Sequence, residues 1–193
     1  MKALEPSILW NNFRSICGIP HPSKHEEKIV AWLCDWAKQH NIAVRQDAIG
    51  NVILSKPATA GMENRKGVIL QAHIDMVPQK NANKKHDFTI DPIEMMVGED
   101  GWVRANGTTL GADDGIGCAA AMSVLESKDI AHGPLEVLIT IDEETGMTGA
   151  FGLNSGEFKG DILLNLDSET EGELYVGCAG GLDANISFAY QQM

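Results

Sequence analysis

The sequence is poor in basic residues, in cysteine and in long apolar stretches. It has 15 Lys and Arg against 27 Asp and Glu, which argues against a nucleic-acid partner because phosphates require a basic surface. Its four cysteines are widely spaced and form no Cys-x-x-Cys pair, which argues against a disulfide framework or a thiolate zinc site. No stretch resembles a signal peptide or a membrane span, so we expect a cytoplasmic protein with no membrane partner.

What the sequence does have is a globular composition in which helical and β-rich segments alternate. Hydrophobic residues make up 44% of the 193 residues and charged residues 22%, which is enough for a packed core. The alternation predicts an α/β fold, a mainly parallel twisted sheet flanked by helices. The expected helices are 6–16, one that follows a capping box at 23–26, and an Ala-rich one that follows the glycine-rich turn 108–117 and runs to about 125. The expected strands are 43–46, 51–54, 68–75, 135–141 and 162–166, with a hairpin over 91–107.

Three of the expected strands end in a histidine or in acidic residues. Their apolar runs are typical of strands buried on both faces of a sheet. The carboxyl ends of parallel strands meet at one edge, where open α/β sheets bind ligands, so we expect these polar side chains to share a site. The run over 68–75 ends in His73-Ile74-Asp75, the run over 135–141 precedes Asp142-Glu143-Glu144, and the run over 162–166 precedes Asp167.

A glycine-rich turn over 108–117 adds two adjacent acids, Asp113 and Asp114, at the start of an expected helix. One of them is explained as a helix N-cap, and the spacing does not decide which. No Gly-Lys-Ser/Thr follows, so a phosphate loop is excluded. Two carboxylates would repel a phosphate but suit a cation.

Each motif also has a plainer explanation. A His-x-Asp pair is common on protein surfaces, and Asp142-Glu143-Glu144 is as well explained by a solvated loop. Together, however, one imidazole and several carboxylates without a thiolate fit Zn²⁺, Mn²⁺ or Co²⁺. They fit best a two-metal site in which a carboxylate bridges ions ~3.5–4 Å apart. An EF-hand over 167–178 is excluded because Cys178 stands where a bidentate glutamate is required.

At these motifs the sequence resembles the co-catalytic zinc metallopeptidases that include aminoacylase and glutamate carboxypeptidase. Within that family it is most similar to bacterial dipeptidases that cleave Xaa-His dipeptides such as carnosine. The resemblance covers nearly the whole chain. The stretches that carry it are 19–23, 56–65, 71–81, 107–113 and 177–181.

The resemblance implies a zinc-dependent dipeptidase with two metal ions, for which Co²⁺ or Mn²⁺ are alternatives. His73 and Asp167 would bind one ion, and Asp113 would bridge both. Glu144 would bind the second ion. Asp75 would orient His73, and Glu143 would act as general base and then as acid to the leaving amine. The resemblance implies no residue that binds the side chains of the dipeptide.

One departure from the family pattern concerns a further histidine ligand. The family takes it from near the C-terminus of a chain more than twice this long, which also carries an inserted lid or dimerisation domain. Here the last histidine is His132, and His21, His25, His40 and His86 are expected to be surface or capping residues. We therefore expect residues 1–193 to be the N-terminal part of a catalytic domain that is cut before the lid and is homodimeric at full length.

Three other functions remain open at this point. The first two are a dipeptidase of broad specificity and an N-acyl amino acid deacylase of the same family. The third belongs to another class of protein, a non-catalytic fragment that binds a single metal ion. Metal stoichiometry separates the third from the others, and the choice of substrate separates the first two.

Overall fold

The computed structural model describes residues 4–168, 170–178, 180–181 and 184–190. Two parts of the sequence used above lie outside the described residues. They are residues 1–3, at the N-terminus where no signal peptide is expected, and Ala179, in the family-like stretch 177–181. None of the helices in the described part is both long and apolar enough to span a bilayer. The helices are α1 Ser7–Cys17, α2 Glu27–Gln39, α3 Ala112–Glu126, α4 Glu143–Gly146 and α5 Thr148–Phe151; the strands are β1 Ala43–Gln46, β2 Val52–Lys56, β3 Val68–His73, β4 Met95–Val97, β5 Val103–Ala105, β6 Leu135–Thr140 and β7 Ile162–Asn165.

The main sheet has the strand order β1-β2-β6-β3-β7. Strand β3 pairs parallel with both β6 and β7, whereas β1–β2 and β2–β6 are antiparallel. The predicted α/β sheet with flanking helices is confirmed, but the sheet is mixed rather than mainly parallel. Strands β1 and β2 are antiparallel because the connection 47–51 is too short for a crossover. The hairpin predicted over 91–107 is also confirmed, as the separate β4–β5 pair.

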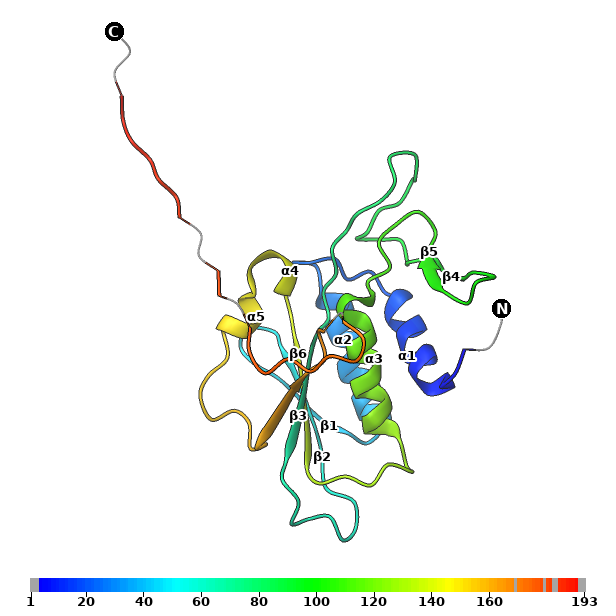
Figure 1. Cartoon of the computed structure of the whole chain (residues 1–193), viewed down its shortest axis with the longest axis vertical. Helices are drawn as coiled ribbons and strands as arrows, with labels where there is room; N and C mark the ends of the chain where they lie inside the picture. The colour runs from blue at the N-terminus through cyan, green and yellow to red at the C-terminus, as the bar shows by residue number, and fades with distance from the viewer. Residues whose placement is uncertain (1–3, 169, 179, 182–183, 191–193) are drawn as a thin grey trace.

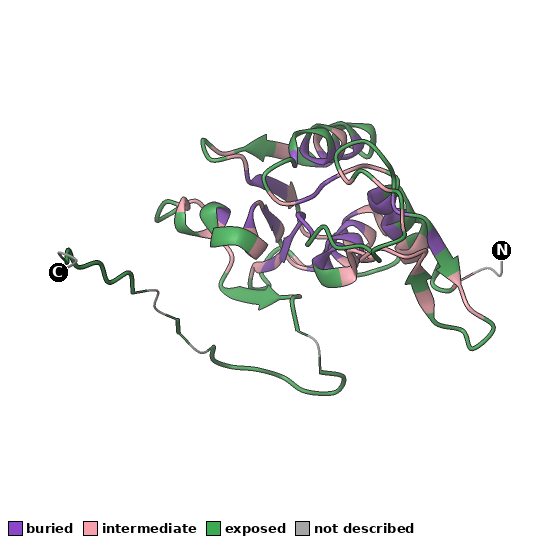
Figure 2. Cartoon of the chain, turned by 90° about the horizontal axis from the view of Figure 1, so that it is seen from above, coloured by how far each residue is buried: buried purple, intermediate pink, exposed green. Residues whose placement is uncertain are grey.

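Helices α1, α2 and α3 lie on one face of the main sheet (Figure 1). The main core lies between these helices and the sheet, where Figure 2 shows the buried residues gathered. Successive side chains of a strand point to opposite faces, so the strands also bury a second, smaller cluster on the other face. The main core includes Phe13, Leu33, Met122 and Ile139; the smaller cluster comprises Ile53, Ile69 and Leu138, with Leu153 and Phe158 packed against them.

The capping box predicted at the start of α2 is not formed. Residue Glu26 is the N-cap of the helix, and its side chain makes no capping hydrogen bond. Ser23 Oγ instead donates to Asp75 Oδ2 at 2.7 Å. The prediction of the helix holds because its apolar face is buried in the core, which contributes more to a helix in a protein than its cap does. The prediction of the cap is wrong because Ser23 has a partner on another element.

Strand β7 lies at the edge of the main sheet and is exposed along its whole length. Ile162, Leu163 and Leu164 are 41%, 55% and 44% exposed. The prediction of a strand here is confirmed, but the prediction that it is buried on both faces is wrong. Within the described residues β7 pairs with β3 alone. The described residues that follow it, from Thr170 onward, are exposed, and their end extends away from the body of the molecule (Figure 1).

Candidate metal centre

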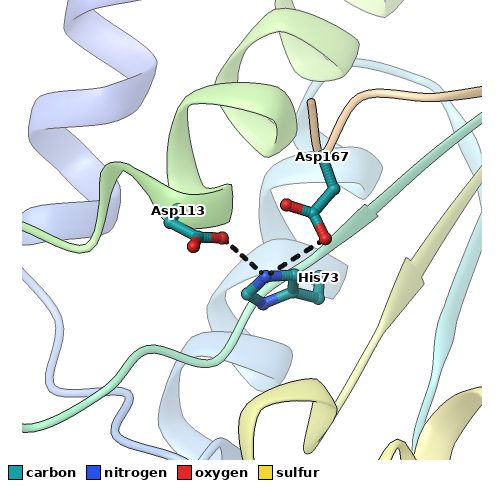
Figure 3. Close-up of side chains that lie close together, drawn as sticks. All are labelled: His73, Asp113 and Asp167. Atoms are coloured by element: carbon teal, nitrogen blue, oxygen red, sulfur yellow. Dashed lines mark hydrogen bonds and ion pairs between the residues drawn. The ribbon is translucent and has the colours of Figure 1, made fainter. Parts of the chain in front are cut away.

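His73 is the last residue of β3, and its imidazole is buried at the carboxyl edge of the sheet. Its Nε2 lies 3.0 Å from Asp113 Oδ1 and 3.9 Å from Asp167 Oδ2. Figure 3 shows both carboxylates directed at this nitrogen, one from the start of α3 and the other from the segment after β7. The edge of the sheet thus brings together three side chains that are far apart in the sequence.

Glu143 and Glu144 approach the same imidazole from a third direction. They open α4, directly after β6 and Asp142. One ligand atom from each of His73, Glu143 and Glu144 lies within 4.8 Å of the others, as is also true of His73, Asp113 and Asp167. Both glutamates are half-buried. His73 is therefore common to two groups, each of which could hold a metal ion.

Asp75 lies on the other side of the imidazole. Nδ1 of His73 is 3.0 Å from the carbonyl oxygen of Asp75 and 3.4 Å from its Oδ1. The carboxylate of Asp75 also accepts the backbone N–H groups of Glu143, at 3.0 Å, and Glu144, at 3.3 Å. The same residue thus contacts the imidazole and holds the turn that carries both glutamates.

The two adjacent acids of the glycine-rich turn have different surroundings. Asp113 is exposed and faces His73, whereas Asp114 is 2% exposed. The carboxylate of Asp114 accepts the backbone N–H of His73 at 3.3 Å and that of Gly117 at 3.2 Å. A Cβ at position 117 would lie 2.1 Å from Asp114 Oδ1, so only glycine leaves room for this carboxylate. Asp114 thus joins the end of β3 to the start of α3, and the glycine three residues later was the sequence signal for it.

The charges around His73 shift its pKa strongly. Burial alone would lower it, but hydrogen bonds and charges from Asp75, Asp114 and Asp113 raise the pKa of His73 to about 10. Burial would raise the pKa of Asp75, but His73, the Glu143 N–H and the Ser23 hydroxyl lower it to about 2. The imidazole and Asp75 therefore stabilise each other's charged form.

Three other acids of the cluster, Asp114, Glu143 and Glu144, show the opposite shift. Burial raises the pKa of Asp114 to about 7, with a further contribution from the charge of Asp167. Burial also raises the pKa of Glu143 and of Glu144; neighbouring carboxylates add to it, Asp167 for the first and Asp113 for the second. The cluster thus holds more negative charge than His73 offsets, which is the electrostatic condition that favours a bound cation.

Sequence reasoning missed several side chains next to this centre. Glu26, Asp75 and Asp142 are all buried, with one carboxylate oxygen from each within 4.8 Å of the others. The sequence pattern places Glu26 in a capping box, and it gives Asp142 no role of its own within the acidic run that follows an expected strand. His21, expected at the surface, is 2% exposed, and its Nδ1–H donates to the Ile19 carbonyl oxygen. Only contacts between distant segments reveal these residues.

Residues 69–179 match Peptidase family M20/M25/M40, and this range contains every acid and histidine assigned above to the centre. The chain is 56% identical to the cytosol non-specific dipeptidase of Escherichia coli, over 95% of this chain and 38% of that protein. It is also similar to the crystal structure of aminoacylhistidine dipeptidase from Vibrio alginolyticus, with 62% sequence identity and a TM-score of 0.88. This match covers 91% of the present chain and 36% of the V. alginolyticus chain.

A more distant solved structure has the same fold. The aminopeptidase PepT from Bacillus cereus is 27% identical with a TM-score of 0.70, over 84% of this chain and 43% of that one. The chain thus spans well under half the length of each of these relatives. The matched range and the identity over nearly the whole chain show that it belongs to the M20/M25/M40 family of peptidases.

Proposed function

We propose that this chain carries part of the catalytic centre of a metal-dependent dipeptidase. One observation carries the proposal: His73 is shared between Asp113 and Asp167 on one side and Glu143 and Glu144 on the other. An imidazole among carboxylates at the carboxyl edge of a sheet is a donor set for divalent cations and matches no nucleophilic triad. The named relatives described above are dipeptidases or an aminopeptidase.

The residues fit a pair of divalent ions. The donors are one nitrogen and several oxygens. Burial raises the pKa values of Glu143 and Glu144, and the negative charge of neighbouring carboxylates adds to the shift. In this proposal His73 and Asp167 would hold one ion, Glu144 would hold the second, and Asp113 would contribute to both; Zn²⁺ is the ion the resemblance favours, with Co²⁺ or Mn²⁺ as alternatives. When bound, such ions lower the pKa of a water molecule and polarise the scissile carbonyl.

The proton transfers fall to Glu143. Its carboxylate takes a proton from the attacking water and passes it to the amine that leaves when the peptide C–N bond breaks. The raised pKa of Glu143 suits this role, because a general base acts best when its pKa lies nearer the working pH. Asp75 fixes the direction of the His73 ring through Nδ1.

The substrate and the assembly belong to the same proposal. We assign dipeptides, with preference for a C-terminal histidine, since the V. alginolyticus structure is named an aminoacylhistidine dipeptidase. The E. coli relative is named non-specific, so broad dipeptide specificity is the second candidate and N-acyl amino acid hydrolysis the third. We further propose that residues 1–193 are the N-terminal part of a longer catalytic domain, in a cytoplasmic enzyme that is homodimeric at full length.

Metal content and substrate choice test this function together. The purified full-length enzyme is titrated with Zn²⁺, and its hydrolysis of carnosine, of a dipeptide without histidine and of an N-acetyl amino acid is compared. Two bound ions with faster hydrolysis of carnosine support the proposal, and equal rates on both dipeptides support the broad dipeptidase. One ion and no hydrolysis of any of the three would instead identify a single-metal protein without catalytic activity.

A further inference from the structure

Glu26 holds two loops together beneath the glutamates of the candidate centre. Its side chain is 6% exposed and lies at the start of α2. A single oxygen, Oε1, accepts the backbone N–H of Lys24 at 2.9 Å and that of Asp142 at 3.2 Å. The second bond joins residues 116 positions apart in the sequence.

Both residues that donate to Glu26 have left-handed backbones. The φ angle is 69° at Lys24 and 51° at Asp142. Residues other than glycine rarely adopt the left-handed backbone region. They remain in it only where hydrogen bonds or packing with their surroundings stabilise it. Hydrogen bonds hold this turn from both sides. The N–H of Asp142 donates to Glu26, and the carboxylate of Asp142 accepts hydrogen bonds from the hydroxyls of Thr145 and Thr148.

The turn at Asp142 sets the direction of the next two residues. Glu143 and Glu144 follow it directly, and their own N–H groups bond to Asp75. Asp75 is in turn bonded to Ser23, in the same loop as Glu26. The loop 23–26 therefore contacts both sides of the turn, Asp75 through Ser23 and Asp142 through Glu26.

We propose that Glu26 is a positioning residue, which aims Glu143 and Glu144 at His73 by holding the Asp142 N–H in its left-handed turn. The inference rests on the proposed function, in which Glu143 carries the proton and Glu144 binds metal. What matters is the length of the Glu26 side chain and an acceptor oxygen at its end. Its negative charge is not required, because an amide oxygen accepts the same two N–H bonds.

Two conservative substitutions separate length from charge. Glu26→Gln keeps the length and the acceptor but loses the charge. Glu26→Asp keeps the charge but draws the oxygen back by about 1.5 Å, beyond hydrogen-bonding reach of both amides. Glu27→Gln, at the exposed neighbouring position, is the matched control.

The first measurement is turnover in the Zn²⁺-loaded full-length enzyme. We expect Glu26→Asp to lower kcat by about 10- to 100-fold with KM changed less than about twofold, because misdirected catalytic groups cost rate rather than affinity. Glu26→Gln is expected to stay within about threefold of the unsubstituted protein. The reverse order, with Gln impaired and Asp active, would overturn the proposal in favour of a role for the charge. Loss of a bound cation in Glu26→Gln would overturn it in favour of a metal site formed by Glu26, Asp75 and Asp142.

The second measurement is amide hydrogen exchange in the metal-free protein. Loss of one hydrogen bond is expected to accelerate exchange at Asp142 about tenfold in Glu26→Asp, with no acceleration in Glu26→Gln or Glu27→Gln. If the unsubstituted full-length enzyme hydrolyses no dipeptide, the proposed function is wrong, and these exchange rates still decide the role of Glu26. Equal exchange at Asp142 in all three variants would overturn the positioning role.

Discussion

Strands β6 and β7 have the same kind of apolar sequence pattern but very different surroundings in the fold. Both are short apolar runs followed by acids, and both belong to the main sheet. Strand β6 lies between β2 and β3 and is buried, with Val137 and Ile139 fully covered. Strand β7 pairs with β3 alone among the described strands and is exposed throughout. An apolar run therefore specifies a strand, while its place in the sheet decides whether that strand is buried.

The same difference extends to the acids that each strand delivers. After β6, the N–H groups of Glu143 and Glu144 bond to Asp75, far away in the sequence. After β7, the N–H of Asp167 bonds to the nearby Asn165 side chain at 3.0 Å. The N–H groups of Glu143 and Glu144 are thus bonded to a buried residue that follows β3, and the N–H of Asp167 is bonded to a residue of its own segment.

The largest expected effect belongs to the acid that follows β6. In the proposed mechanism Glu143→Gln removes the proton carrier while His73, Asp113 and Asp167 remain, so turnover is expected to fall by about 10²- to 10⁴-fold. Zn²⁺ content, measured on the same sample, is expected to be unchanged. Glu99→Gln, in an exposed loop, is the control. Near-normal turnover of Glu143→Gln would remove Glu143 from the role of base.

Next in size is a truncation inside β6. Leu138 is 3% exposed and packs with Ile53 and Ile69, so Leu138→Ala is expected to lower the free energy of unfolding by about 2–5 kcal/mol. Urea unfolding monitored by circular dichroism measures the change. A loss below about 1 kcal/mol would mean that this face of the sheet is less tightly packed than its burial indicates.

A smaller effect, on the affinity for Zn²⁺, is expected from substitution of Asp75, which contacts both His73 and the turn after β6. Asp75→Asn keeps the shape of the side chain but loses the negative charge beside Nδ1 of His73. The affinity for Zn²⁺ is expected to fall by about 10- to 100-fold, since partners of metal-binding histidines act on affinity through the ring. Competition with a chromogenic chelator measures it, and Asp100→Asn, on the exposed β4–β5 loop, serves as control. Unchanged affinity would argue against an orienting role for Asp75.

The contrast between β6 and β7 also explains what the sequence could predict. Helical periodicity located α2, and apolar runs located most of the strands, because these patterns arise from local geometry. The convergence of His73 with the acids followed from strand ends that share one edge. Three features depend on contacts between distant segments, which no local spacing encodes: the exposure of β7, the Ser23–Asp75 bond and the Glu26–Asp142 bond.

The smallest expected effect is on β7, and it completes the comparison. Leu164 is 44% exposed, so Leu164→Ala removes side-chain surface that water already contacts and is expected to cost less than about 1 kcal/mol of unfolding free energy. Measured beside Leu138→Ala by the same urea titration, it isolates burial, since both substitutions remove the same atoms. A cost of about 2 kcal/mol or more would mean that another chain segment or a second molecule covers β7 in solution.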